Sequence, residues 1–307
     1  MKAVVTGASS MIASALIRLL VEEGHEVYAL CRPNSAKLGN IIKNERVHIV
    51  YSDISDITAV GQNIGCGCDA FFHFAWGGTS GAQRNDSRIQ SENIRFTLDA
   101  VELAQALGCS VFVGAGSQAE YGRGDGKISP DTPTFPENAY GAAKLAAGQL
   151  SRIACAKHGI RHVWARILSV YGIGDNDFTI TVSSLRKMLA GQTAQFTPAE
   201  QMWDFLYCDD AARAFYLMAQ FGKDGAVYTL GSGQARPLKE YISIMYRVSG
   251  ADGDVQIGAL PYNDKQVMYL CADISALTAD TGFVPQVSYE EGIKETVKWL
   301  KGSERNE

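Results

Sequence analysis

The first half of the chain alternates short apolar segments, typical of buried strands, with longer amphipathic segments, typical of helices. The expected strands are residues 3–6, 27–31, 47–51, 70–74, 110–114 and 163–168. The expected helices are residues 11–23, 89–107 and 140–158. This rhythm predicts an α/β fold, a doubly wound parallel sheet with helices on both faces.

A glycine-rich turn, Thr6-Gly7-Ala8-Ser9-Ser10-Met11-Ile12-Ala13-Ser14, joins the first expected strand to the first helix. In such a turn, backbone N–H groups at a helix N-terminus can meet a cofactor pyrophosphate. Only Gly7 of three expected glycines is present, because Ser10 and Ala13 occupy the other two positions. An ordinary strand–turn–helix is the competing interpretation.

Tyr140 and Lys144 stand four residues apart in the third expected helix, so their side chains share one face. A nearby ammonium favours the phenolate, and we therefore predict a lowered tyrosine pKa suited to general acid/base work. An exposed helical pair is the structural alternative. Ser117 follows the fifth strand in a glycine-rich segment, where parallel sheets gather ligands, and is placed to hydrogen-bond a substrate carbonyl.

The chain after about residue 170 has a looser rhythm, with turn residues at 175–177, 192–198 and 250–261. Its 307 residues leave room for two domains. We expect a dinucleotide-binding domain over residues 1–170. Residues 171–307 are expected to form a smaller, mixed α/β substrate-binding region, partly interleaved with the first.

The charge balance excludes several classes of protein. Lys and Arg number 28 against 33 Asp and Glu, a net charge of −5, which lacks the basic footprint of a nucleic-acid binder. No apolar run is long enough for a membrane span, and no signal peptide opens the chain, so we expect a cytoplasmic protein. Cys66 and Cys68 have no second pair at zinc spacing, so no metal site is expected.

These motifs, in this order, resemble the extended short-chain dehydrogenase/reductases, the family of nucleotide-sugar epimerases, dehydratases and reductases. The resemblance runs nearly end to end and includes segments 166–172, 203–210 and 228–233. It implies a Rossmann-type sheet and a catalytic triad of Ser117, Tyr140 and Lys144. The implied cofactor-binding residues are Gly7, Ser9, Ser10, Met11, Ile12, Arg32, Asp53, Ile54, Phe74, Ala75, Trp76, Asn93, Tyr140 and Lys144.

Two departures from the family pattern narrow the function. Dehydratases of the family carry an Asp-Glu pair where this chain has Gln118 and Ala119, which cannot transfer a proton. NAD users usually carry an acidic residue after the second strand, where this chain has Cys31 and then Arg32. A guanidinium there suits a 2′-phosphate, so NADP(H) is favoured, with NAD(H) as the alternative. Arg32 as a solvent-facing loop residue is the structural interpretation.

Preference for NADP(H) suggests net reduction, and the chain resembles most the nucleotide-sugar 4-ketoreductases of that family. We therefore expect an oxidoreductase that reduces the 4-keto group of a deoxysugar, with Tyr140 as general acid. A 4-epimerase with tightly bound NAD is the alternative. A non-catalytic NADP-binding or sensing protein is a further one, and the Tyr140/Lys144 pair argues against it. The resemblance also implies a homodimer formed through the helices at 89–107 and 140–158, which could instead pack only on their own sheet.

The substrate side departs furthest from the family. Two arginines that usually clamp the substrate diphosphate are replaced, one by Trp203 and one near Asn263. The expected substrate-binding residues are Gln118, Ser169, Trp203 and Asn263. The candidates to replace the lost charge are Arg166, Arg186, Lys187 and Arg236. The substrate is an unusual nucleotide sugar or a keto-sugar without a diphosphate. His73, at the end of the fourth strand, is expected to be structural.

Overall fold

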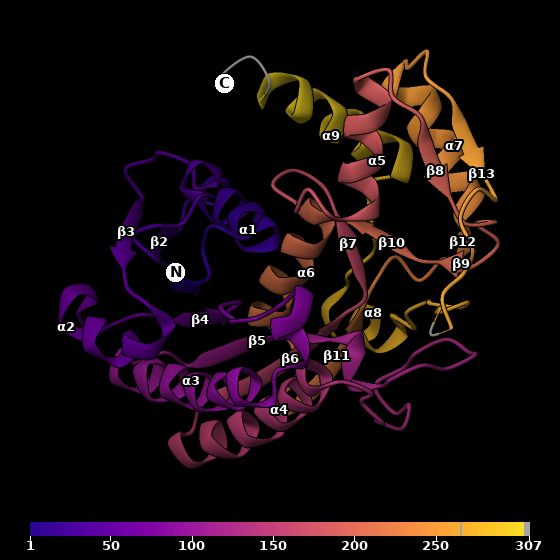
Figure 1. Ribbon diagram of the computed structural model, residues 1–307. Coiled ribbons are helices and arrows are strands. Elements are labelled where there is room, and N and C mark those ends of the chain that lie inside the picture. Colours follow the sequence, from indigo (N-terminus) through magenta and orange to yellow (C-terminus); the bar gives the residue numbers. More distant parts are fainter. Residues whose placement is uncertain (265, 304–307) are drawn as a thin grey trace.

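A seven-stranded parallel sheet forms the centre of the computed structural model, which describes residues 1–264 and 266–303 (Figure 1). The strand order is β11-β6-β5-β4-β1-β2-β3. The strands are β1 (Lys2–Thr6), β2 (Glu26–Cys31), β3 (Val47–Tyr51), β4 (Ala70–His73), β5 (Val111–Ser117), β6 (Arg161–Ile167) and β11 (Ala226–Leu230). The order reverses between β1 and β4, which is where doubly wound sheets bind their ligands. The predicted fold class is confirmed.

Helices cover both faces of this sheet (Figure 1). α1 (Met11–Glu22) packs beside α6 (Cys208–Phe221) on one face, and α3 (Ser87–Ala106) packs beside α4 (Ala139–His158) on the other. The short α2 (Gly61–Ile64) precedes β4. Each element predicted in the first half occurs, and its ends differ from the prediction by at most three residues.

β5 extends furthest beyond its predicted end. The predicted strand ends at Gly114, whereas Ala115, Gly116 and Ser117 are also strand residues here. The Trp164 indole from β6 fills the space that a Cβ atom on either glycine would occupy. The two glycines therefore admit a close approach within the sheet, and the turn begins only after Ser117.

The elements after residue 170 gather mostly to one side of the sheet (Figure 1). They are β7 (Ser169–Tyr171), α5 (Ile180–Leu189), β8 (Ala194–Phe196), β9 (Met202–Trp203), β10 (Phe205–Tyr207), β12 (Arg236–Pro237), α7 (Leu238–Ser249), β13 (Val255–Ile257), α8 (Ser275–Thr281) and α9 (Tyr289–Ser303). Strand pairs β10-β7, β12-β9 and β13-β8 form three small sheets. The chain returns to the main sheet through α6 and β11, so the two parts interleave.

No helix within residues 1–264 and 266–303 has both the length and the apolar character needed to cross a membrane.

Candidate functional site

The turn after β1 and the segment after β4 touch at the point where the strand order reverses. Gly7 has a φ of +63°, and a Cβ atom on it would lie 2.8 Å from the backbone nitrogen of Ala75. Only glycine satisfies both conditions without strain. The two segments therefore pack directly against each other at the carboxyl ends of β1 and β4, the place where sheets of this kind have their ligand crevice.

The N-terminus of α1 faces this crevice with its first-turn N–H groups free of side-chain caps. Ser10 is the N-cap residue, yet its side chain makes no capping hydrogen bond and is exposed. Met11 and Ile12 follow, half-buried, in the first turn of α1. A helix N-terminus of this kind fits a cofactor pyrophosphate through its backbone dipole and amide donors. Ser10 in place of glycine leaves that approach open.

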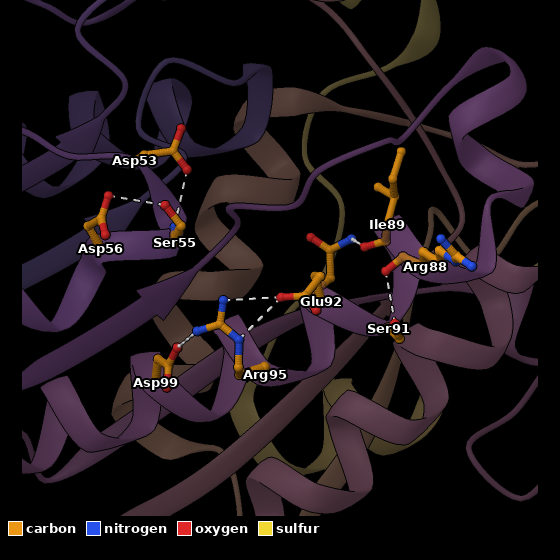
Figure 2. A network of polar contacts seen from close by, with 10 residues as sticks. Asp53, Ser55, Asp56, Arg88, Ile89, Ser91, Glu92, Arg95 and Asp99 are labelled. Atoms are coloured by element: carbon orange, nitrogen blue, oxygen red, sulfur yellow. Dashed lines mark hydrogen bonds and ion pairs between the residues drawn. The ribbon is translucent and has the colours of Figure 1, made fainter.

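A pocket of about 620 Å³ lies beyond the carboxyl end of β2. Arg32 and Asp53 both line it, together with Asp56. Asp53 accepts a hydrogen bond from the Ser55 amide (3.1 Å), while the Ser55 hydroxyl donates to Asp56 (3.1 Å), as Figure 2 shows. The pocket is thus lined by one residue with a guanidinium and two with carboxylates. Ile54 follows Asp53 in the η2 turn (Ile54–Val60).

The segment after β4 is fixed by buried polar side chains of α3. The Asn93 amide accepts a hydrogen bond from the Gly77 nitrogen (2.8 Å) and donates one to the Gly77 carbonyl (3.0 Å). Trp76 donates through Nε1 to the Gln90 side chain (2.9 Å). Asn93 therefore holds the backbone of this segment in place. At the start of the segment, the Phe74 ring packs against Phe215 with ring centroids 4.6 Å apart.

His73 is a buried, neutral histidine. Thr6 Oγ1 accepts hydrogen bonds from the nitrogens of Phe74 (3.1 Å) and Ala75 (3.2 Å), so its proton is left for His73 Nδ1 at 3.0 Å. Burial, with the positive charge of Lys144 as a lesser cause, lowers the pKa of His73 to about 3. This arrangement agrees with the structural role expected for His73.

Lys144 is buried beneath Trp76. Its Nζ donates a 2.6 Å hydrogen bond to the Ala115 carbonyl and lies 3.7 Å from the centroid of the Trp76 ring. Burial lowers the pKa of Lys144 to about 7; Glu120 opposes this change and Arg84 adds to it. The Ala115 carbonyl and the face of the Trp76 ring therefore hold the Lys144 amino group in this position.

Tyr140 lies at the start of α4, with its ring edge toward Trp76 at a centroid distance of 6.0 Å. The sequence predicts a lowered pKa for Tyr140, whereas burial raises it in the structure. The Arg84 charge and a hydrogen bond with Ser117 oppose that rise. The removal of the hydroxyl from water outweighs the attraction of nearby cations, a balance that helical spacing alone does not reveal.

Ser117 ends β5 and is held by a buried carboxylate. Its backbone nitrogen donates to Glu120 Oε1 (2.8 Å), which also accepts from Trp164 Nε1 (3.1 Å). Arg166 Nε donates to Glu120 Oε2 at 2.6 Å in a fully buried ion pair. The Glu120 carboxylate thus orients the turn that carries the Ser117 hydroxyl.

A second pocket, of about 560 Å³, begins close to the β6 strand partner of Ser117. The Cα partner of Ser117 on β6 is Ile167, and the residue after it, Leu168, lines the pocket. Ser169 and Trp203 also line it and are joined by a 2.8 Å hydrogen bond from the indole to the serine hydroxyl. Two of the expected substrate-binding residues therefore meet in one wall.

The other two expected residues lie apart from this wall. Gln118 is half-buried in the η4 turn (Gln118–Glu120), and it does not line the pocket. Asn263 is exposed and donates to Gln266, which does line it (3.3 Å).

Among the four candidates for the missing positive charge, Lys187 lines the pocket. Arg166 is paired with Glu120, and Arg186 is paired with Asp177 at 3.0 Å. Arg236 is exposed on β12, and it does not line the pocket. Lys187 is therefore the candidate that the fold brings to this pocket.

Contacts between the two halves of the molecule were missed in the sequence. Lys37 Nζ donates to the Gly174 carbonyl (3.0 Å) and to Asn176 Oδ1 (2.8 Å), and the Asn40 amide donates to the Ser9 carbonyl (3.1 Å). The Ser9 hydroxyl also lies 2.9 Å from that of Ser35. The loop after β2 thus connects the turn after β1 to the elements after residue 170. In the sequence these residues are ordinary polar loop residues, and nothing in them indicates the contact.

Asp175 is a further buried acid that lines the substrate pocket. It accepts hydrogen bonds from the Asn176 nitrogen (2.7 Å) and from Thr179 Oγ1 (3.0 Å). Burial raises its pKa to about 6.

Within the described residues, no group of three or more His, Cys, Asp or Glu side chains is arranged to hold a metal ion.

Comparisons with known proteins agree with this geometry. The sequence model described as the NAD dependent epimerase/dehydratase family matches residues 3–231. CDP-abequose synthase from Salmonella muenchen is 27% identical over 300 residues, which cover 95% of this chain and 96% of that protein.

Solved structures share the same fold over almost the whole chain. UDP-glucose 4-epimerase from Thermotoga maritima, solved with UDP-glucose, aligns with a TM-score of 0.87 at 23% identity and covers 99% of both chains. UDP-glucuronic acid 4-epimerase from Bacillus cereus, solved with UDP-glucuronic acid and NAD, aligns with a TM-score of 0.85 at 24% identity, covering 99% of this chain and 100% of that one.

Proposed function

The chain belongs to the NAD dependent epimerase/dehydratase family, and from this premise we propose that it is an NADP(H)-dependent reductase. Its substrate is the 4-keto group of a deoxysugar, carried on a nucleotide. The observation that carries this proposal is the convergence of Ser117, Tyr140 and Lys144 beside the crevice where β1 and β4 diverge.

The residues of that crevice fit a dinucleotide. Gly7 lets the segment after β4 approach the turn after β1, the N-terminus of α1 supplies backbone donors for the pyrophosphate, and Arg32 lines the pocket for the adenosine end. When bound in reduced form, the dinucleotide supplies the hydride that the ketone carbon accepts. Lys144, whose Nζ lies 5.9 Å from the centroid of the Tyr140 ring, is the residue that we assign to the nicotinamide ribose.

Tyr140 acts as the general acid. Its hydroxyl, hydrogen-bonded to Ser117, gives its proton to the carbonyl oxygen as the ketone becomes an alcohol. Ser117 orients that oxygen, and Glu120 fixes Ser117 through its backbone nitrogen. The net change consumes one hydride and one proton for each ketone reduced.

The geometry speaks against a dehydratase. Ala119 is buried and Gln118 carries no ionisable group, so neither can move a proton. The next residue, Glu120, has both oxygens engaged by Trp164, Arg166 and the Ser117 nitrogen. A carboxylate held in this way is structural.

Preference for NADP(H) rests on Cys31 and Arg32, because the carboxylate of NAD users is missing after the second strand and a guanidinium follows there. Asp53 and Asp56 line the same pocket, and their negative charge would disfavour a 2′-phosphate that no cation neutralises. Arg32 supplies that cation, and its planar fork suits a phosphate.

A homodimer formed through α3 and α4 is part of this proposal. Leu150 (43% exposed) and Ile153 (58% exposed) on α4 provide apolar surface for it.

A panel of 4-keto nucleotide sugars, assayed with NADPH and with NADH, tests the proposal. We expect NADPH to be consumed in proportion to a 4-hydroxy product identified by NMR. Turnover without added cofactor, by protein that releases NAD on denaturation, would identify a 4-epimerase instead. Absence of turnover with every sugar, despite tight NADPH binding, would support the non-catalytic alternative.

A further inference from the structure

Arg84 lies in the η3 turn (Gly81–Asn85), outside the motifs that the sequence singles out. Its guanidinium carbon is 4.0 Å from the centroid of the Tyr140 ring. Nη1 donates a 2.9 Å hydrogen bond to the Thr79 carbonyl, and the residue is half-buried. A cation is therefore fixed on the face of the residue assigned as general acid.

The turn that carries Arg84 is anchored on both sides. Asn85 Oδ1 accepts a hydrogen bond from the Ala139 nitrogen (3.1 Å) at the start of α4, one residue before Tyr140. The buried Gln90 amide donates to the carbonyls of Gly78 (2.7 Å) and Gln83 (3.0 Å). These contacts hold Arg84 at a set place relative to Tyr140.

Charged groups reach the Tyr140–Lys144 pair from the elements packed around it. Arg84 on η3 lowers the pKa of both residues, and Glu120 on η4 raises the pKa of both. A further titratable neighbour, His73 on β4, is neutral near pH 7 because its pKa is about 3. Arg84 is thus the cation that opposes the effect of burial at Tyr140.

We propose that Arg84 is a positioning residue of the reaction centre. By stacking on Tyr140 it orients the ring, and by its charge it sets the protonation state in which the Tyr140–Lys144 pair exchanges a proton with the substrate. The proposal takes from the proposed function only the role of Tyr140 as acid/base. The effect of Arg84 on Lys144 is independent of any substrate.

Lys144 provides a readout that needs no turnover. Protein labelled with ¹³C at the lysine side chains is titrated by NMR, and the Lys144 signal is assigned by its loss in Lys144→Arg. In wild type we expect the signal to titrate near pH 7. Arg84→Met keeps the stem and removes the charge, so the Lys144 signal should titrate at a higher pH than in wild type. Arg84→Lys, which keeps the charge, should stay near wild type.

Arg88→Met is the matched control. Arg88 is exposed one turn further along, contributes its backbone carbonyl to Ser91 (2.8 Å), and directs its side chain away from that contact (Figure 2). Its removal should leave the Lys144 titration unchanged. An Arg84→Met titration identical to wild type, in folded protein, would overturn the proposal, and so would an equal shift in Arg88→Met.

The pH dependence of kcat gives the second readout, once a keto-sugar substrate is in hand. The limb that reports Tyr140 should move to higher pH in Arg84→Met, with cofactor affinity unchanged. An unchanged profile with only a raised KM would show that Arg84 merely contacts the substrate, and the proposal would be wrong. If no keto-sugar is turned over by wild type, the proposed function fails while the Lys144 titration still decides the role of Arg84.

Discussion

Gly7 and Ala75 lie against each other just beyond the carboxyl ends of β1 and β4, and a Cβ atom on Gly7 would lie 2.8 Å from the Ala75 nitrogen. This contact predicts a specific loss in Gly7→Ala. Left-handed backbone costs a non-glycine residue roughly 1–3 kcal/mol, and the clash adds to this by moving the segment after β4. We expect lower thermal stability together with weaker NADPH binding, measured by unfolding and by fluorescence titration.

Gly24→Ala is the control for that substitution. Gly24 has a φ of +78°, and a Cβ atom on it would meet nothing within 4 Å, so it shares the backbone strain and lacks the clash. It should lose stability without losing cofactor affinity. Equal effects of the two variants on NADPH binding would contradict the assignment of Gly7 to the cofactor crevice.

Tyr140→Phe removes the proposed proton donor and keeps the ring that lies against Arg84 and edge-to-face with Trp76. Loss of a general acid typically costs about 10²–10⁴-fold in rate. We expect a fall in kcat of that order, with the dissociation constant for NADPH nearly unchanged. Tyr246→Phe, on the exposed face of α7, is the control. Turnover near wild type in Tyr140→Phe would remove Tyr140 from its role.

Arg32→Ala tests the cofactor preference. A hydrogen bond to a charged group contributes roughly 1.5–3 kcal/mol, so NADPH binding should weaken by at least about tenfold. NADH has no 2′-phosphate, and its affinity should hardly change. Lys43→Ala, an exposed lysine in the same loop, controls for the loss of one positive charge. Equal weakening of both cofactors by Arg32→Ala would contradict the preference for NADP(H).

His73 makes stability depend on pH in acid. Its folded pKa of about 3 lies below the usual value near 6.5, so between these values the unfolded chain binds a proton that the folded chain excludes. The folded state therefore loses stability as pH falls through this window, with a slope approaching about 1.4 kcal/mol per pH unit.

His73→Gln removes this titration. Urea unfolding of wild type and variant at pH 7, 6, 5 and 4 should show wild type losing stability faster, so that the two curves converge in acid. Parallel losses in the two proteins would show that His73 is protonated in the folded state.

The sequence predicted those features that depend on local patterns. Apolar runs and helical periodicity located six of the seven strands of the sheet together with α1, α3 and α4, but β11 and α6 were not predicted. The spacing of Tyr140 and Lys144 was enough to place both on one helix face. Features that depend on distant contacts were missed. Arg84 reaches Tyr140 only because Gln90 and Asn85 hold the η3 turn against α4.

The sequence also does not show how closely other residues pack around a given side chain. The pKa of Tyr140 rises where a fall was predicted, because packing around the hydroxyl cannot be inferred from residue spacing. The predicted fifth strand stops at Gly114, yet β5 continues through Gly116 to Ser117, and the Trp164 indole fills the space beside both glycines. The sequence offered four candidate cations to replace the missing arginines but could not place them, and only the fold separates Lys187 from the ion-paired Arg166 and Arg186.

Hydride transfer from added cofactor to the sugar is the central claim, and isotope transfer tests it most directly. The enzyme is incubated with a 4-keto nucleotide sugar and NADPH that carries deuterium at both C4 positions of the nicotinamide, and the product is examined by NMR and mass spectrometry. We predict one deuterium at C4 of the sugar for each NADP⁺ formed. A product without deuterium, formed with no net oxidation of NADPH, would contradict the account and identify an epimerase that recycles its own cofactor.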